Sequence, residues 1–312
     1  MTINNKSEQP LVSFVMNCYN GEKYLRRSLK SILEQTYENW ELVFWDNAST
    51  DSSKAILESY HEPRFKYYRS KENVTLGQAR AWAVEACKGD FIAFLDVDDE
   101  WLPRKTEIQV REMLKDDYVM SCGDIIEVDE DNPSRQRITR IPRKSGYLFE
   151  EELFNFDLNL PTGFIRTSAL KKKGLNFDPF VKASEEVCLF MQLIYDEKVC
   201  IVNEVIAKYY VRRNSLTNKC IDRWYVERFY ILDKLKASHP EIPNRYSQAW
   251  EEANARGVYY EARYLVHAGD RKQARERMRT VRKAGKKYML LYWMLFLPSF
   301  VWNKVHYIKN MR

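Results

Sequence analysis

Three aspartates directly after a short apolar run are the part of this sequence most suggestive of chemistry. Asp96, Asp98 and Asp99 follow residues 91–95, and an apolar run of this length predicts a strand buried on both faces. Open α/β sheets bind ligands at the carboxyl ends of such strands. Neighbouring carboxylates repel one another unless they are neutralised, so the pattern favours Mg²⁺ or Mn²⁺ shared with substrate phosphates. A solvated acidic turn remains the alternative, because short Asp-x-Asp pairs also occur by chance.

The residues around this run alternate between strand-like and helix-like patterns. Short apolar runs predict strands at 11–16, 40–45, 65–69 and 91–95, and helical spacing of apolar residues predicts helices at 22–35, 54–60 and 78–87. This alternation predicts a parallel sheet in which the loops at 17–21, 46–51 and 96–99 meet along one edge. Neither a Gly-x-Gly-x-x-Gly after the first strand nor a P-loop motif occurs, which argues against dinucleotide oxidoreductases and P-loop NTPases.

Length and composition are those of an ordinary globular protein. At 312 residues the chain can form one large domain with an appendage or two modest domains. The net charge of +6 is mild, but Arg and Lys concentrate after Arg256, which favours an anionic partner there. The six cysteines form no Cys-x-x-Cys pair, so we expect free thiols and no zinc site. The polar N-terminus and the lack of a bilayer-length apolar run predict a cytoplasmic protein without a signal peptide.

The chain resembles family 2 glycosyltransferases of the bacterial surface-polysaccharide type, which have the GT-A nucleotide-diphospho-sugar transferase fold. Four motifs in the family's order carry the resemblance: Val12–Gly21 (VSFVMNCYNG), Trp45–Asp51 (WDNASTD), Asn73–Arg80 with Gly77 inside it, and Leu95–Asp99 (LDVDD). The resemblance implies an α/β fold with a mainly parallel central sheet flanked by helices, followed here by a C-terminal α-helical extension.

The resemblance also implies roles for residues on the donor side. Asn17, Tyr19 and Asn20 would line the nucleotide pocket. Asp46 would accept a hydrogen bond from the ring N–H of the base, which suits uracil or thymine, and Arg80 would approach the base or the phosphates. Helix capping by Asp46 and a helix-surface pair between Arg80 and Glu85 are the plainer alternatives.

The Asp-x-Asp pair of the family corresponds here to Asp96 and Asp98, with Asp99 adjacent. The resemblance implies that this group holds the donor's ribose and a Mn²⁺ or Mg²⁺ ion on its diphosphate. The sequence does not assign the direct metal ligand among the three; Asp98 is our first choice.

On the acceptor side, the family pattern Gly…Phe-Asp…Glu-Asp-x-x-Leu is matched from Gly174 to Leu189. The second acid of the Glu-Asp pair serves as general base in this family, and here Glu186 stands where Asp is usual. A base must lie within hydrogen-bond reach of the acceptor hydroxyl, so the extra methylene matters. Glu185 is the second candidate for the base. Two acids stabilising the first turn of a helix are the alternative.

Two arginines, Arg212 and Arg213, occupy the position of a family loop that folds over the diphosphate. The resemblance implies that they neutralise the leaving group, a role suited to planar guanidinium donors. The histidine frequent in this loop is absent, and a solvated basic pair is the alternative.

The remaining sequence gives expectations about organisation. We expect a catalytic domain at 1–218, with a nucleotide half (1–101) and an acceptor half (102–218) whose strands include 118–122 and 124–128, and a helical region at 219–312 with helices at 224–237, 247–268 and 271–285. Gly269 and Asp270 predict a helical hairpin. Residues 286–304 are apolar and aromatic with basic flanks, which favours a membrane-surface segment. Packing on the protein's own core and a homodimer contact are the alternatives.

Together these features predict a metal-dependent, inverting hexosyltransferase at the cytoplasmic face of the inner membrane. UDP-hexose is the first-choice donor and dTDP-rhamnose the second. The acceptor would be a hydroxyl of a lipid-linked or growing surface glycan, as in O-antigen or capsule synthesis. A scaffold or nucleotide-sugar-binding protein that has lost catalysis is the alternative, because Glu replaces Asp at the base. Nucleic-acid binding by the basic C-terminal region fits poorly with its aromatic run.

Overall fold

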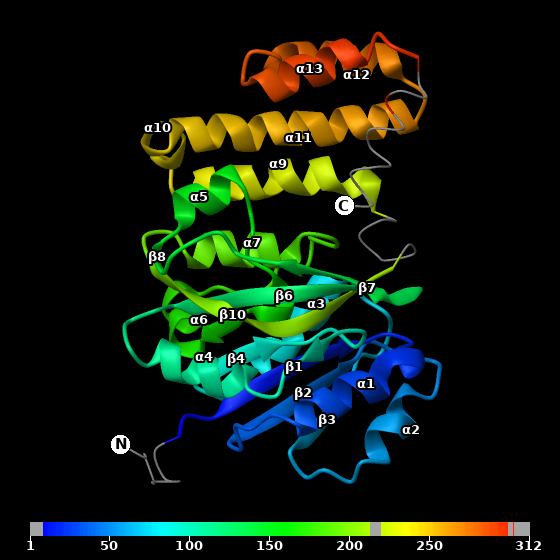
Figure 1. The fold of residues 1–312 in the computed structure, drawn as a ribbon, viewed down its shortest axis with the longest axis vertical. Coiled ribbons are helices and arrows are strands. Elements are labelled where there is room, and N and C mark those ends of the chain that lie inside the picture. The colour runs from blue at the N-terminus through cyan, green and yellow to red at the C-terminus, as the bar shows by residue number, and fades with distance from the viewer. Residues whose placement is uncertain (1–8, 213–219, 299–301, 303–312) are drawn as a thin grey trace. The chain divides into compact units, whose positions relative to one another are not determined.

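The computed structural model describes residues 9–212, 220–298 and 302 (Figure 1). The chain divides into two compact units, one of residues 1–152 with 156–215 and one of residues 153–155 with 216–312. The domain boundary expected near residue 218 lies outside the described residues and stays a prediction.

The first unit is built on one sheet whose strands pair in the order β3-β2-β1-β4-β9-β6-β10-β5, with β7 added on β6 and β8 on β10. The strands are β1 (Val12–Cys18), β2 (Trp40–Asp46), β3 (Phe65–Arg69), β4 (Phe91–Phe94), β5 (Glu100–Trp101), β6 (Met120–Asp129), β7 (Asn132–Thr139), β8 (Gly146–Tyr147), β9 (Phe164–Arg166) and β10 (Lys198–Val211). β3, β2, β1 and β4 are parallel neighbours, and β6 is parallel to β10. The alternation predicted for the first hundred residues is therefore confirmed.

Helices follow the strands of this unit. They are α1 (Glu22–Leu33), α2 (Ser53–Glu58), α3 (Leu76–Glu85), α4 (Lys105–Met113), α5 (Phe149–Phe154), α6 (Thr167–Lys173) and α7 (Glu185–Leu193), with a 3₁₀ turn at Leu160–Thr162. In α1, Leu25, Leu29 and Ile32 are fully buried at helical spacing. This stripe packs α1 against the sheet and fixes the loop between β1 and α1 at the sheet's carboxyl edge.

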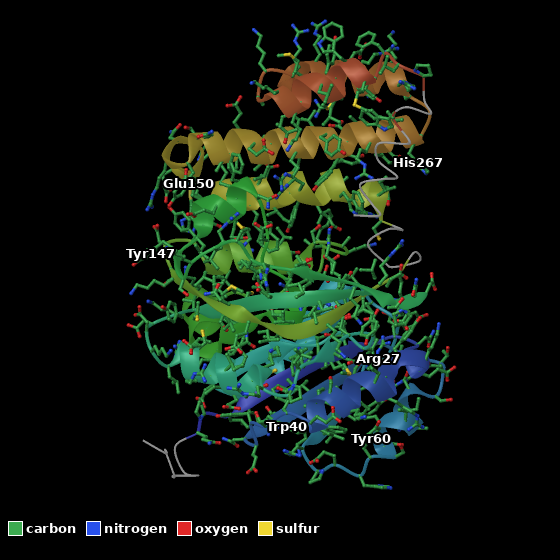
Figure 2. All side chains as sticks on the ribbon, in the orientation of Figure 1. Arg27, Trp40, Tyr60, Tyr147, Glu150 and His267 are labelled. Carbon is green, nitrogen blue, oxygen red and sulfur yellow. The ribbon has the colours of Figure 1, made fainter. Side chains whose placement is uncertain are left out.

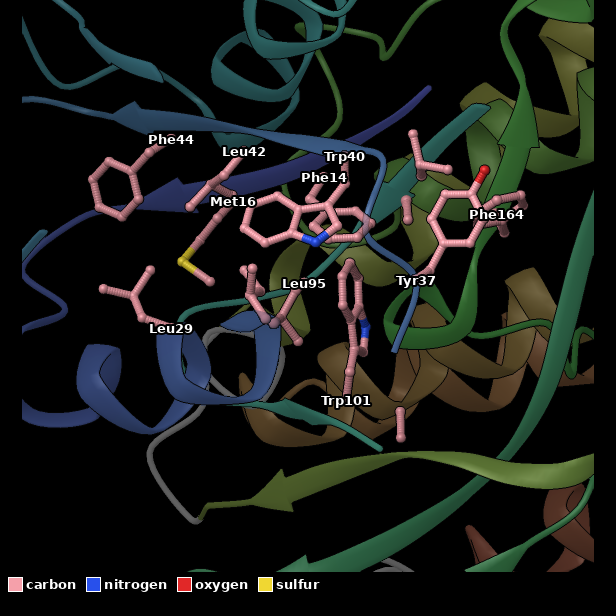
Figure 3. Packing of buried hydrophobic residues seen from close by; sticks show 14 of the residues in the cluster. Phe14, Met16, Leu29, Tyr37, Trp40, Leu42, Phe44, Leu95, Trp101 and Phe164 are labelled. Atoms are coloured by element: carbon pink, nitrogen blue, oxygen red, sulfur yellow. The ribbon is translucent and has the colours of Figure 1, made fainter. Parts of the chain in front are cut away.

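The core beneath the aspartates is aromatic. All four residues of β4 are buried, as expected for a strand covered on both faces. Figure 3 shows Phe14, Trp40 and Trp101 packed together, and the rings of Phe14 and Trp101 meet edge to face with centroids 4.8 Å apart. Trp101 lies two residues beyond Asp99, so this packing anchors one end of the loop formed by residues 96–99, called the aspartate loop below.

A single long strand, β6, replaces the two strands predicted at 118–122 and 124–128. Gly123 does not interrupt it, because the missing side chain makes room for Ile206 on β10. A Cβ atom at residue 123 would lie 2.7 Å from Cδ1 of Ile206. The glycine is thus a close-approach position inside a continuous strand.

The second unit is helical, as predicted. Its helices are α9 (Ile221–Ser238), α10 (Ile242–Arg245), α11 (Ser247–His267), α12 (Arg271–Val281) and α13 (Lys286–Met294). The chain reverses between α11 and α12 at Gly269, whose φ of +87° favours glycine. α13 buries Tyr288 and Tyr292 in this unit's own core. Within the described part of the chain, no helix is both long enough and apolar enough to cross a bilayer.

Candidate active site

The carboxyl ends of β1 and β2 are joined by hydrogen bonds between their loops. The backbone N–H of Asn20 donates to Oγ of Ser49 over 3.0 Å, and the N–H of Thr50 donates to Oδ1 of Asn20 over 2.8 Å. Tyr19 is 54% exposed beside them, whereas Asn17 is buried. The loops therefore meet along one edge as predicted, and the nucleotide-binding roles of Asn17, Tyr19 and Asn20 stay predictions.

Asp46, at the end of β2, is fully buried and surrounded by donors. Its Oδ1 accepts from the N–H of Ser49 over 2.7 Å, and its Oδ2 accepts from the hydroxyl of Tyr67 over 2.7 Å and from the guanidinium of Arg69. Arg69 also donates to the carbonyl oxygen of Ser49 over 2.9 Å. Sequence reasoning missed Arg69, although its place at the end of a parallel strand was a usable signal.

The three aspartates after β4 lie in different surroundings. The guanidinium of Arg80 donates to Oδ1 of Asp96 over 2.6 Å, and Asp98 forms an ion pair with Arg212. Asp99 is buried and accepts at Oδ1 from the backbone N–H of Tyr210 over 3.0 Å. Burial, followed by the charge of Asp96, raises the pKa of Asp99 well above its ordinary range. Asp99 thus joins the loop to β10, while Asp96 and Asp98 remain partly exposed, at 34% and 18%.

Side chains of α1 hold the backbone of the aspartate loop. The hydroxyl of Ser28 lies within hydrogen-bond distance of the carbonyl oxygens of Val97, at 2.6 Å, and Asp99, at 2.8 Å. Arg27, labelled in Figure 2, donates to the carbonyl oxygen of Asp98 over 2.7 Å. The main chain of the loop is therefore held by contacts that do not involve the carboxylates of Asp96 and Asp98.

Arg27 itself is fixed by contacts with distant segments. It donates to both carboxylate oxygens of Glu130, over 3.2 and 3.0 Å, and its guanidinium lies 3.5 Å from the ring centroid of Tyr210. A bidentate pair and a stacked ring restrict a long side chain strongly. α1, the β6–β7 turn and β10 are thereby connected beside Asp98.

Arg80 is the central cation of the site. Its side chain is 3% exposed and donates to Asp96 on the donor side and to Glu185 on α7. The plainer alternative, a pair on the helix surface, does not describe this buried residue. Contact of Arg80 with a base or phosphate stays a prediction. Within this structure it neutralises two carboxylates from different halves of the unit.

α3 can approach the acceptor half closely because residue 77 is glycine. A Cβ atom there would lie 2.2 Å from the carbonyl oxygen of Asp178. The hydroxyl of Thr75, the N-cap of α3, also donates to the carbonyl oxygen of Pro179 over 2.8 Å. This contact places Arg80, one turn further along α3, within reach of Glu185.

The two candidate bases begin α7 and differ in environment. Glu185 is buried and paired with Arg80, whereas Glu186 is half-buried. Burial and the neighbouring charge of Glu185 raise the pKa of Glu186, and the positive charge of Arg80 acts in the opposite direction. A carboxylate with a raised pKa suits a general base near neutral pH. The assignment of either residue as the base stays a prediction.

Arg212 ends the described part of its loop, and Arg213 lies outside the described residues. Besides pairing with Asp98, the guanidinium of Arg212 lies 4.6 Å from the ring centroid of Tyr24 on α1. Arg212 therefore lies at the aspartate loop, and its contact with a diphosphate stays a prediction.

The carboxylates present fit a divalent ion shared with a substrate. Across residues 9–212, 220–298 and 302, no group of three His, Cys, Asp or Glu side chains is arranged to hold an ion alone. Mg²⁺ and similar ions need only one or two carboxylates when phosphates complete their coordination. Asp96 and Asp98 supply such oxygens, and Asp99 has a buried Oδ2 without a hydrogen-bond partner among the described residues.

The chain is similar to known glycosyltransferases. The profile described as Glycosyl transferase family 2 matches residues 13–176. The Escherichia coli protein WfgD, named UDP-Glc:alpha-D-GlcNAc-diphosphoundecaprenol beta-1,3-glucosyltransferase, is 29% identical over 67% of this chain and 80% of its own length. TuaG of Bacillus subtilis, named a putative teichuronic acid biosynthesis glycosyltransferase, is 26% identical over 70% of this chain and 88% of its own.

Solved structures show the same architecture. Staphylococcus aureus TarS in complex with UDP-GlcNAc superposes with a TM-score of 0.62 at 16% identity, covering 80% of this chain and 81% of that one. The mannosyltransferase PcManGT from Pyrobaculum calidifontis, in complex with GDP-Man and Mn²⁺, gives a TM-score of 0.58 at 16% identity, covering 93% and 85%. At these identities the likeness establishes the fold.

Proposed function

This chain belongs to glycosyltransferase family 2 and has the GT-A fold, and we propose that it transfers a hexose, with inversion, from a nucleoside diphosphate to a hydroxyl of a surface glycan. The observation that carries the proposal is the buried bridge through Arg80. It ties Asp96, on the predicted donor side, to Glu185, next to the predicted base Glu186. Donor and acceptor groups thus belong to one electrostatic cluster.

The proposed reaction is a single displacement. Glu186 takes the proton of the acceptor hydroxyl as its oxygen bonds to the anomeric carbon from the face opposite the diphosphate. The bond from that carbon to the diphosphate oxygen breaks in the same step, so the anomeric configuration inverts. Glu185 is the second candidate for the base.

Asp96 and Asp98 would hold Mn²⁺ or Mg²⁺, with Asp99 as the remaining candidate ligand. Such an ion, when bound, offsets the negative charge of the leaving diphosphate. Arg212 lies at the same loop and would donate to the diphosphate oxygens, and Arg213 is proposed to assist it.

We propose UDP-hexose as donor, ahead of dTDP-rhamnose, and a lipid-linked or growing surface glycan as acceptor. The names of the relatives support this choice, since WfgD is named for UDP-Glc and a diphosphoundecaprenol-linked sugar, and TuaG for teichuronic acid. PcManGT was solved with GDP-Man, so the fold also accommodates guanine nucleotides in other members.

We also propose work at the cytoplasmic face of the inner membrane. One face of α13 lies in the core of the second unit, but Leu290 and Trp293 are 63% and 56% exposed. Lys283, Lys286 and Lys287, just before or within the first turn of α13, are exposed as well. Exposed apolar and aromatic side chains next to lysines suit the surface of an anionic bilayer. A homodimer contact through the same face is the competing use.

The decisive experiment for catalysis is Glu186→Gln. We expect kcat to fall by about two to four orders of magnitude, because general-base catalysis is lost, while binding of UDP with Mn²⁺ is kept. Glu150→Gln, an exposed first-turn acid on α5, is the matched control and should transfer at the parental rate. Transfer by Glu186→Gln at the parental rate would refute the base assignment. If the parental protein binds nucleotide but transfers no sugar, the alternative of a nucleotide-sugar-binding or scaffold protein is favoured. If no nucleoside diphosphate stabilises the parental protein in a thermal-shift panel, the transferase proposal and this alternative are both refuted.

A further inference from the structure

Asp46, whose carboxylate is expected to accept a hydrogen bond from the nucleobase, is buried from solvent. The side chain of Asp46 is 0% exposed, and its oxygens already accept from Ser49, Tyr67 and Arg69. A group that a water molecule cannot touch is equally out of reach of a base in this conformation. Asp46 therefore holds its neighbours rather than meeting a ligand directly.

Arg69 is the charged group that faces outward at this place. Its side chain is 43% exposed, although its guanidinium is held by Asp46 and by the carbonyl oxygen of Ser49 over 2.9 Å. Guanidinium carries five N–H donors and no acceptor, so donors remain for a ligand after these contacts. Arg69 also lines a pocket of about 370 Å³ with Trp45, Ser70 and Trp82. A fixed, partly exposed arginine is suited to reading hydrogen-bond acceptors.

The strand order would place Arg69 near the base of a nucleotide whose phosphates lie after β4. The predicted diphosphate site lies after β4, and the order β4, β1, β2, β3 leads outward from it to Arg69 at the end of β3. A nucleotide whose phosphates lie at Asp96 and whose base lies over the β1 and β2 loops would point the base edge remote from the ribose toward β3. In uracil that edge carries the O4 carbonyl, and in cytosine it carries an amino group.

We propose that Arg69 is a specificity-determining residue that selects donors whose base presents a carbonyl oxygen on this edge, with Asp46 and Tyr67 as its positioning residues. The inference rests on the proposed function. Uracil, thymine and guanine meet the requirement. Cytosine does not, because its amino group would oppose the N–H donors and leave both unpaired.

The test compares binding of UDP and CDP, each with Mn²⁺, by titration calorimetry. The parental protein should prefer UDP by on the order of tenfold or more, as for one well-placed set of hydrogen bonds. Arg69→Met should reduce the preference to within about threefold. Arg69→Met leaves the buried Asp46 without its cation, so the double variant Asp46→Asn/Arg69→Met keeps the test valid if the single variant does not fold. Lys71→Met removes an exposed cation from the same pocket and should keep the parental preference.

Each result has a definite meaning. The inference is supported if the Arg69 variants lose the UDP preference while Lys71→Met keeps it. A preference retained in Arg69→Met or in the folded double variant overturns it, as does equal binding of UDP and CDP by the parental protein, although the proposed function survives in both cases. If the parental protein binds no nucleoside diphosphate, the proposed function fails, and the inference fails with it.

Discussion

At the scale of single residues, the environment of Glu186 makes a prediction about pH. A base acts only when ionised, and burial with the charge of Glu185 raises the pKa of Glu186 above the ordinary carboxyl range. The value of kcat/KM should therefore fall as pH decreases through this raised pKa, well before an ordinary glutamate would be protonated. Glu185→Gln removes a like charge and frees Arg80 to interact with Glu186, and both changes lower the pKa of Glu186. The rise of kcat/KM with pH should therefore occur at lower pH in this variant. If kcat/KM of Glu185→Gln rises at the same pH as in the parental protein, or at a higher pH, this account is contradicted.

Lys105 gives a second prediction, about stability. It is fully buried, donates to Oε1 of Gln109 over 2.7 Å, and lies 4.1 Å from the ring centroid of Trp101, and no carboxylate of the described residues forms an ion pair with it. Burial lowers its pKa to about 7. Between that value and the ordinary pKa of about 10.4, the unfolded chain binds more protons, so stability should rise with pH across this window, by a few kcal/mol at most.

Lys105→Met removes this titration. Urea midpoints at pH 6, 7.5 and 9 should show the variant most stable relative to the parent at pH 6, with the difference shrinking as pH rises. Lys172→Met, at an exposed position, should follow the parental profile. Parallel pH profiles for Lys105→Met and the parent would show that the buried lysine keeps an ordinary pKa.

Some residues of the candidate site could be predicted from the sequence, and others could not. Sequence reasoning singled out Asp96, Asp98, Asp46 and Arg80 because strand ends and motif spacing are local properties. It did not find the partners of Arg80 or the burial of Asp46, because these depend on tertiary contacts between segments far apart in the sequence. Arg69 was visible only as the last residue of a weak strand.

At the scale of elements, the approach of α3 to the acceptor half depends on Gly77. In Gly77→Ala the new Cβ would lie 2.2 Å from the backbone oxygen of Asp178, so the two segments must separate. We expect a loss of about 1–3 kcal/mol in unfolding free energy. We also expect a lower kcat, because Arg80 and Glu185 would move apart. Gly285→Ala is the matched control, because a new Cβ atom there would lie 3.9 Å from Cδ2 of Tyr288, an ordinary van der Waals contact. Parental stability in Gly77→Ala would contradict the close approach.

The pattern of apolar residues predicted the strands and helices of the first hundred residues, but it divided β6 into two strands. Alternating runs predicted β1 to β4 and their helices because each buries a continuous apolar face. The two strands predicted at 118–122 and 124–128 form the single strand β6, inside which Gly123 makes room for Ile206. A glycine in a strand pattern can mark a break or a close approach, and only the neighbouring strand decides between them.

At the scale of the whole molecule, the exposed face of α13 makes the membrane proposal testable. Leu290→Glu/Trp293→Glu should reduce sedimentation with vesicles containing anionic lipid by about tenfold or more, because apolar area is lost and charge repulsion is added. Leu114→Glu, at a 60% exposed position in the first unit, is the control. Equal sedimentation of the double variant and the parent would refute the membrane contact. A change of oligomeric state in light scattering, without vesicle binding by the parent, would assign the face to a homodimer.

The support given by α1 to the aspartate loop has a consequence for engineering. Ser28 and Arg27 contact carbonyl oxygens of the loop, which every amino acid supplies. Substituting Asp98, the proposed metal ligand, would therefore change the proposed ligand set while leaving the backbone contacts in place. A small library at residue 98, with Asn, Glu or His, could then retune ion preference without redesigning the scaffold.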